Sequence, residues 1–201
     1  MNEQRRLIAS ELYAESSEHD RARADRLDRF RNVEPETAEL LGVLIRATRA
    51  RRILEIGTSN GYSTIWLADA AQGTGGRVSS VDVDPARTEL ARRNLGSAGL
   101  IDVVELRTED AAETLAASED SAWEFVFLDA ERPAYPSYLA DLVRILAPAG
   151  LLAIDNVRSH EHELTEFTAL IEAVPSLTQT VAAVGAGLRL AVKDASPRVP
   201  A

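Results

Sequence analysis

The 201-residue sequence predicts an α/β fold, with a doubly wound sheet of seven strands and helices on both faces. Three observations lead to this prediction. Short β-rich runs alternate with helical segments from residue 52 onward. Most of these runs are almost continuously apolar, which is typical of parallel strands covered on both faces. The last two runs are joined by a glycine-containing turn at residues 184–187, so the final strand should be antiparallel in a mostly parallel sheet.

The elements follow one another in a regular order. Segment 3–31 is rich in charge with few apolar residues, and we expect one or two amphipathic helices there, lying on the domain. Pro35 suits the first position of a helix over 35–49. The predicted strands are 52–56, 77–82, 102–107, 123–128, 150–154, 177–184 and 187–193. The predicted helices between them are 62–71, 85–98, 110–117, 135–146 and 161–173.

Length and composition indicate one domain over residues 1–201, with a helical lid or dimer segment at 1–31 and a flexible tail at 195–201. The net charge of −10 argues against a broad nucleic-acid-binding surface. The absence of cysteine excludes disulfides, thiolate metal sites and cysteine nucleophiles. No apolar run is long enough for a membrane span, and the N-terminus lacks the apolar region of a signal peptide. We therefore expect a cytoplasmic protein.

The most informative motif lies in segment 53–64. An apolar strand runs into Glu55-x-Gly57-x-x-x-Gly61 and then into a helix. Glycines let the backbone approach a ligand closely, and the start of a helix offers free N–H groups and a positive dipole end. This predicts a nucleotide pocket, although an acid stands where dinucleotide-binding proteins have their first glycine. A carboxylate there opposes a pyrophosphate and suits a positively charged ligand, such as the amino group of S-adenosylmethionine.

The next two strand ends also carry acids. Asp82 follows Gly57 by 25 residues, near the offset at which nucleotide-binding folds place an acid on the ribose hydroxyls. Asp84, directly before Pro85, is explained as a helix N-cap. Asp110 either accepts a proton from the adenine amino group or caps the helix at 110–117, and both interpretations stay open.

Two further apolar strands deliver Asp129 and the pair Asp155-Asn156 to the same sheet edge. Two carboxylates and an amide oxygen form a hard donor set suited to Mg²⁺, or to another divalent cation such as Mn²⁺ or Ca²⁺. Without a cation the two acids would repel each other. An alternative is that one of the acids caps a helix or turn.

Together these motifs resemble the cation-dependent class I O-methyltransferases, the group that includes catechol and caffeoyl-coenzyme A O-methyltransferases and has a Rossmann-like fold. The resemblance runs from about Asn32 to Lys193. It rests on the order and spacing of segments 31–37, 54–58, 61–63, 81–85, 127–130, 153–157 and 184–188.

The resemblance implies a role for each matching residue. The methionine part of S-adenosylmethionine would be held by Val33, Glu55, Gly57 and Ser63. Asp82 would bind the ribose, and Asp110 and Ala111 would flank the adenine. The neighbouring motif residues that complete the predicted cofactor site are Thr58, Ser59 and Val83. The metal ligands would be Asp129, Asp155 and Asn156, with Asp129 also near the cofactor.

The sequence departs from the family pattern near the reacting end. Arg132 stands where relatives usually have lysine, and arginine cannot take a proton. It could orient an anionic substrate or stabilise a phenolate, or it could be a surface residue at a helix start. We expect a metal-acidified acceptor hydroxyl to lose its proton to water. His160 is the runner-up base, although a lone histidine is more often simply exposed. The insertion that follows the metal ligands in many relatives is absent, and the short N-terminal segment predicts a small lid. Tyr62 and Tyr135 are candidate pocket residues.

The expected function is methyl transfer to a hydroxyl of a small catechol-like or other vicinal dihydroxy acceptor, by a homodimeric enzyme that uses neither nucleic acid nor membrane. Two alternatives stay open. One is methylation of a hydroxylated uridine in transfer RNA, which the acidic balance disfavours. The other is a nucleotide-binding protein without catalysis or a Rossmann oxidoreductase, which the Glu-x-Gly spacing and the Asp129, Asp155 and Asn156 set disfavour.

Overall fold

The computed structural model describes residues 1–158 and 161–195. Its strands are β1 (Arg52–Ile56), β2 (Arg77–Asp82), β3 (Val104–Thr108), β4 (Trp123–Leu128), β5 (Leu146–Ile154), β6 (Leu177–Ala182) and β7 (Leu188–Lys193). Its α-helices are α1 (Glu3–Arg21), α2 (Pro35–Thr48), α3 (Tyr62–Thr74), α4 (Pro85–Ser97), α5 (Ala111–Ala117), α6 (Tyr135–Ile145) and α7 (Thr165–Glu172). Short 3₁₀ turns are η1 (Ile101–Val103), η2 (Arg132–Ala134) and η3 (Glu161–Glu163). No helix within these residues is both long and apolar enough to cross a membrane.

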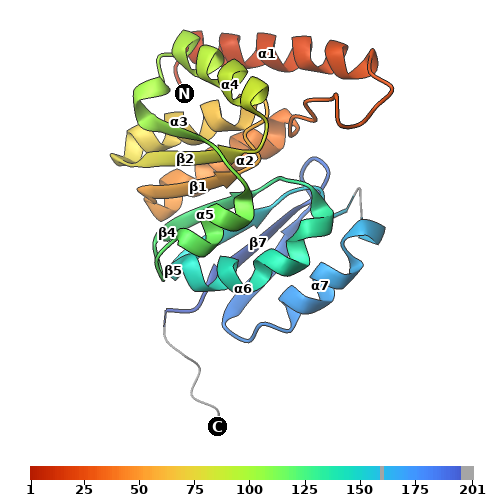
Figure 1. The fold of residues 1–201 in the computed structure, drawn as a ribbon. Coiled ribbons are helices and arrows are strands. Elements are labelled where there is room, and N and C mark those ends of the chain that lie inside the picture. Colours follow the sequence, from red (N-terminus) through yellow and green to blue (C-terminus); the bar gives the residue numbers. More distant parts are fainter. Residues whose placement is uncertain (159–160, 196–201) are drawn as a thin grey trace.

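The seven strands form one sheet in the order β3-β2-β1-β4-β5-β7-β6 (Figure 1). Strands β1 to β5 are parallel, whereas β7 runs antiparallel to both β5 and β6. The predicted fold class, including the antiparallel last strand, is therefore confirmed. Because β1 lies between β2 and β4, the chain reverses its direction of progress across the sheet at this point, and ligands bind at such switch points.

Alternate residues of the central strands pack into opposite layers. Ile53 and Phe125 belong to the layer formed with α1, α2 and α3. Leu54 and Val126 belong to the layer formed with α5, α6 and α7, which cover one face of the sheet in Figure 1. This explains the continuous apolar runs, since a strand covered on both faces needs apolar residues at every position.

Several boundaries differ from the sequence-based expectation by two to four residues, most of all the starts of β5 and α7. β5 begins at Leu146 rather than at residue 150 because its pairing with β4 shifts register near Trp123, and the strand continues through an irregularity at Ala149, which has a φ of 60°. In the N-terminal segment a single helix, α1, is followed by an irregular stretch. We call residues 22–34 the lid segment.

Helix α1 is fixed to the body by polar contacts as well as by apolar ones. Arg5 donates to the Asp69 carboxylate at 2.8 Å and to the carbonyl oxygen of Ala98 at 3.1 Å. Ser16, nearly buried on α1, accepts a hydrogen bond from the Asn60 amide in the loop after β1. The helix is thereby tied to the loop that the Glu-x-Gly motif forms.

The sheet core yields a stability prediction. Phe125 is fully buried at the centre of β4, so Phe125→Ala should lower the free energy of unfolding by about 3–5 kcal/mol. Leu170→Ala, at a position that is 42% exposed on α7, is the control and should change it by less than about 1 kcal/mol. Urea titration followed by circular dichroism measures both, and equal effects would contradict the layer assignment.

Candidate functional site

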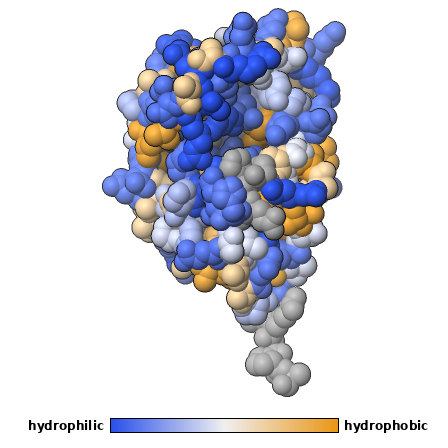
Figure 2. Space-filling model, turned by 90° about the vertical axis from the view of Figure 1, so that its right-hand side faces the viewer, coloured by the Kyte–Doolittle hydropathy of each residue, from blue (hydrophilic) through white to orange (hydrophobic). Residues whose placement is uncertain are grey.

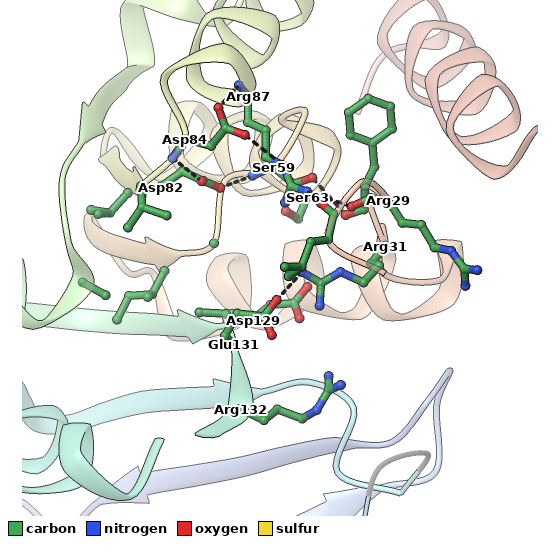
Figure 3. Close-up of a pocket in the computed structure, with 18 of the residues that line it drawn as sticks. Arg29, Arg31, Ser59, Ser63, Asp82, Asp84, Arg87, Asp129, Glu131 and Arg132 are labelled. Atoms are coloured by element: carbon green, nitrogen blue, oxygen red, sulfur yellow. Dashed lines mark hydrogen bonds and ion pairs between the residues drawn. The ribbon is translucent and has the colours of Figure 1, made fainter. Parts of the chain in front are cut away.

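A large pocket lies beyond the carboxyl ends of the parallel strands, with a cavity volume of about 550 Å³ (Figure 3). This volume falls in the range of small-molecule and cofactor sites. Its floor comes from the ends of β1, β2 and β4, and its roof comes from the lid segment. The face on the side of the lid segment is predominantly hydrophilic (Figure 2). Among the described residues, Ser63, Asp82, Ala111, Asp129 and Asn156 all line the pocket.

The loop after β1 reaches the pocket because Gly57 has no side chain. Its φ is +105°, and a Cβ there would lie 2.0 Å from the carbonyl oxygen of Asp129. Gly61 also has a positive φ, and a Cβ there would lie 3.0 Å from the Cβ of Ala91 on α4. Only glycine adopts such backbone conformations without strain and permits this close approach.

Glu55 lies one layer beneath the pocket. It is fully buried, and its carboxylate accepts hydrogen bonds of 2.5–2.6 Å from the hydroxyls of Ser63, Thr64 and Ser80. Burial raises the pKa of Glu55 to about 7, and the three hydroxyl donors act against this rise. Because the Ser63 hydroxyl donates its hydrogen bond to Glu55, the Ser63 oxygen is available to accept a hydrogen bond from a ligand in the pocket.

Asp82 is held rigidly at the end of β2. Its two carboxylate oxygens accept hydrogen bonds from the backbone N–H groups of Ser59 at 2.8 Å and Asp84 at 3.0 Å. Asp110 accepts from the N–H of Ala112 at 2.8 Å, so it caps α5, and it also lines the pocket. The two interpretations of Asp110 are therefore compatible.

Asp129, Asp155 and Asn156 meet at the opposite end of the pocket. The Asn156 amide lies 3.3 Å from Asp129 Oδ1 and 2.8 Å from Asp155 Oδ2. Asp155 is 1% exposed, and its Oδ1 has no hydrogen-bond partner among the described residues. Burial raises the pKa of both acids. The Asp129 charge adds to the rise in the pKa of Asp155, while Arg31 and Arg132 oppose the rise in that of Asp129. A buried carboxylate oxygen without a donor is rare in folded proteins and calls for a partner such as a water molecule or an ion.

The lid segment is fastened over the pocket by charged groups. The Asp20 carboxylate accepts hydrogen bonds of 2.8 Å from the N–H groups of Phe30 and Arg31. Arg87, on α4, donates to the carbonyl oxygens of Leu27 and Arg29. Three residues that line the pocket hold a positive φ although they are not glycine, namely Arg31, Ser59 and Asn156. Such strained backbone persists where the surrounding structure over-determines it, often at functional sites.

The structure brings most of the predicted site residues together. Within the described residues, those that line the pocket are Val33, Gly57, Ser59, Ser63, Asp82, Val83, Asp110, Ala111, Asp129, Arg132 and Asn156. Glu55, Thr58 and Asp155 stand directly behind the wall, where Thr58 shares a hydrogen bond with Ser80. His160 lies outside the described residues. The functional roles of all these residues stay predictions.

Two interpretations from the sequence need correction. Arg132 is not a surface residue, because its side chain is 5% exposed and its Nε donates to Glu163 at 2.7 Å. Tyr62 and Tyr135 are wrong as pocket residues, since both are buried in the core, and the Tyr135 hydroxyl bonds the backbone of Ala130. The tyrosine that lines the pocket is Tyr138, one turn further along α6.

The sequence predicted a lid within residues 1–31, but not which of its residues line the pocket. The lid residues that line the pocket without having been predicted are Arg26, Leu27, Arg29, Phe30, Arg31 and Asn32. The density of arginine in segment 21–31 of an acidic chain was the one available signal. Tyr138 carried a weaker signal, because its place on the pocket side of α6 depends on how that helix packs.

A glycine loop beside acids at successive strand ends is the arrangement of an α/β protein that binds a nucleoside-bearing cofactor. A family model described as O-methyltransferase matches residues 13–193, so the chain belongs to the O-methyltransferase family.

Similar proteins agree with this assignment. The chain is 38% identical over 125 residues to a catechol O-methyltransferase of Mycobacterium tuberculosis, covering 62% of this chain and 56% of that protein. It is 36% identical over 129 residues to a catechol O-methyltransferase of Niastella koreensis, covering 63% of this chain and 58% of that protein. The matches thus span little more than half the length of these relatives.

Solved structures share the fold. The O-methyltransferase from Bacillus cereus in complex with SAH is 29% identical, with a TM-score of 0.78 over 94% of this chain and 91% of that one. An O-methyltransferase from Streptomyces achromogenes involved in tomaymycin synthesis, in complex with SAM, is 27% identical, with a TM-score of 0.75 over 96% of this chain and all of that one.

The buried Glu55 generates a prediction for stability against pH. Its folded pKa of about 7 exceeds the value near 4.3 in unfolded chains, so the folded state binds the extra proton between these values. The contribution to stability is fully present below about pH 4.3 and is lost as pH rises through 7, by roughly 4 kcal/mol in total.

The variant Glu55→Gln cannot titrate at residue 55. Relative to the wild type, its free energy of unfolding should therefore increase as pH rises from 5 to 8. Urea titrations at several pH values measure the difference. Asp129 and Asp155 titrate in both proteins and drop out of the comparison. Two parallel curves would contradict a raised pKa at Glu55.

Proposed function

We propose that this chain is an S-adenosylmethionine-dependent O-methyltransferase that methylates a hydroxyl of a small, catechol-like or vicinal dihydroxy acceptor with the help of a divalent cation. The observation that carries the proposal is the single pocket that joins Asp82 and Ala111 at one end to Asp129 and Asn156 at the other. The first end suits a nucleoside, and the second suits an acceptor hydroxyl.

In this proposal the chain binds the donor through features already described. The Asp82 carboxylate is fixed by two backbone N–H groups, and its remaining lone pairs face the ribose hydroxyls. Ala111 and Tyr138 line the end assigned to the adenine. Ser63, as a hydrogen-bond acceptor made so by Glu55, receives the amino group of the methionine part. The donor's positive sulfonium then lies toward the Asp129 end, which carries negative charge.

The acid and amide set fits a divalent cation by its chemistry. Within residues 1–158 and 161–195 no group of three or more histidine, cysteine or acidic residues is arranged so that it could hold a metal ion, but two carboxylates with an amide oxygen suit Mg²⁺. The unpartnered Oδ1 of buried Asp155 supports this, and the Asn156 amide would turn its oxygen toward the ion. A bound cation would lower the pKa of an acceptor hydroxyl and fix its direction.

The chain's own contribution to rate is chiefly positioning. Asp129 and Asn156 line the same end of the pocket, where they would hold the acceptor oxygen close to the donor methyl group. Arg132 cannot act as the base and is occupied through Nε by Glu163. The acceptor proton therefore passes to water or to His160 in this proposal. The lid segment covers the donor and limits the access of bulk water.

Variants at the two ends separate donor binding from methyl transfer. Asp155→Ala and Asn156→Ala should lower turnover of a catechol in the presence of Mg²⁺ by at least about a hundredfold, while S-adenosylhomocysteine binds as in the wild type. Asp82→Ala should instead weaken S-adenosylhomocysteine binding by about tenfold or more. Calorimetry measures binding, and mass spectrometry of the methylated product measures turnover.

Asp102→Ala, on the exposed η1 turn away from the pocket, is the matched control for the loss of one carboxylate. Full turnover in the presence of a chelator would refute the cation. Tighter binding of NAD than of S-adenosylmethionine would refute the donor. The expected homodimer and the expected lack of nucleic-acid substrates remain predictions, tested by analytical ultracentrifugation and by methyl transfer to bulk transfer RNA.

A further inference from the structure

The transfer end of the pocket, around Asp129 and Asn156, is unusually rich in arginine. Arg26, Arg31 and Arg132 all line it, although the chain as a whole is acidic. The acids that face these arginines are Glu34, Asp129, Glu131, Asp155 and Glu163. Ligand pockets are usually lined by apolar side chains with a few polar ones. A charged lining therefore indicates the chemistry of what binds there.

The three glutamates among these acids already accept hydrogen bonds. Both carboxylate oxygens of Glu131 accept hydrogen bonds, one from Arg26 and one from Arg31. Glu163 accepts from Arg132, and Glu34 accepts from the N–H of Ala186. Glu131 and Glu163 thus hold the arginines in place.

The arginines, in contrast, have N–H donors that no described residue accepts. The Arg132 side chain is more than nine-tenths buried, yet among the described residues only Glu163 accepts from it, through Nε, and neither terminal nitrogen has a hydrogen-bond partner there. Arg31 donates to Glu131 through one terminal nitrogen, and its buried Nε has no partner among the described residues. The same holds for the amide nitrogen of Asn32, which also lines the pocket. Buried donors left unpaired cost free energy that a ligand can recover.

Specific contacts hold the backbone of Arg31 in an unfavourable conformation. Its backbone has a φ of 54°, which costs free energy for a residue with a side chain. The Asp20 carboxylate stabilises this conformation by accepting from the N–H groups of Phe30 and Arg31. Figure 3 shows the Arg31 side chain extending from the lid segment toward Asp129 and Glu131, whereas Arg29 points away. The guanidinium groups of Arg29 and Arg87 donate to backbone carbonyl oxygens of the lid segment, so these two arginines are not counted with Arg26, Arg31 and Arg132.

We propose that Arg31 and Arg132 form a carboxylate-binding site at the transfer end, and that the carboxylate belongs to the methyl acceptor. This inference rests on the proposed function and narrows its substrate class to hydroxylated compounds that carry a carboxylate. Planar guanidinium groups with parallel N–H donors match a carboxylate in geometry and charge. The donor's amino-acid part is the other possible source of the carboxylate. The acceptor is favoured because Arg132 acts electrostatically on both Asp129 and Asp155, where the acceptor hydroxyl would lie.

The test compares two probes that differ only in charge. Protein saturated with S-adenosylhomocysteine and Mg²⁺ is titrated calorimetrically with 3,4-dihydroxybenzoate and with 3,4-dihydroxybenzamide. The wild type should bind the acid at least about tenfold more tightly than the amide, as charge-assisted hydrogen bonds predict. Arg132→Gln and Arg31→Gln should each remove most of this preference, while affinities for the amide and for S-adenosylhomocysteine stay within about twofold of wild type.

Arg92→Gln, which removes one exposed arginine from α4, is the matched control and should keep the full preference. Arg31→Gln also serves as the second variant if Arg132→Gln does not fold, because Arg31 is more exposed. A parallel titration compares S-adenosylhomocysteine with its decarboxylated analogue. A preference that the arginine variants abolish there, and not with the benzoate pair, would assign the site to the donor and overturn the acceptor assignment.

The remaining outcomes are equally decisive. Equal affinity of the wild type for acid and amide, an unchanged preference in both variants, or binding of neither probe to protein that holds S-adenosylhomocysteine would overturn the inference and leave the proposed function standing. Failure of S-adenosylhomocysteine itself to bind would count against the proposed function.

Discussion

The close approach of two backbone segments at Gly57 and Asp129 is the constraint on which the site depends. The N–H of Gly57 donates to the carbonyl oxygen of Val81, and the N–H of Asp129 donates to that of Ile56. The loops after β1, β2 and β4 are thereby joined at one point. A side chain at residue 57 would collide with the Asp129 carbonyl, so glycine there sets the distance between the nucleoside end and the transfer end of the pocket.

Charge is distributed in two layers around this point. The Glu55 carboxylate, buried below the pocket, accepts hydrogen bonds from three hydroxyls. One of them is that of Ser63, whose oxygen can therefore only accept a hydrogen bond at the pocket wall. Asp129 and Asp155 form a second acidic pair, and the arginines of the lid segment and of η2 stand above them. The sequence motif suggested that Glu55 would meet a cationic ligand directly. In the structure its influence reaches the pocket through Ser63, while its direct role in binding stays a prediction.

The fold and the floor of the site follow from local sequence signals. A strand covered on both faces has to be apolar throughout, and the residues after parallel strands meet at one edge, so Asp82, Asp129 and Asp155 could be placed from sequence. The roof could not. The conformation of the lid segment depends on the Asp20 carboxylate, which accepts hydrogen bonds from backbone N–H groups about ten residues later. No periodic pattern in the sequence predicts this pairing. The burial of Arg132 likewise depends on Glu163, a partner that is distant in sequence.

The central claim is that one sheet edge brings a nucleoside-bearing methyl donor and an acceptor hydroxyl together. A crystal structure with S-adenosylhomocysteine and Mn²⁺, recorded with anomalous data, tests it most directly. The account predicts the ribose on Asp82, the thioether sulfur turned toward Asp129, and an anomalous peak among Asp129, Asp155 and Asn156. A ligand bound elsewhere, or a ligand in the pocket with its sulfur turned away from Asp129 and no peak at the acids, would contradict it.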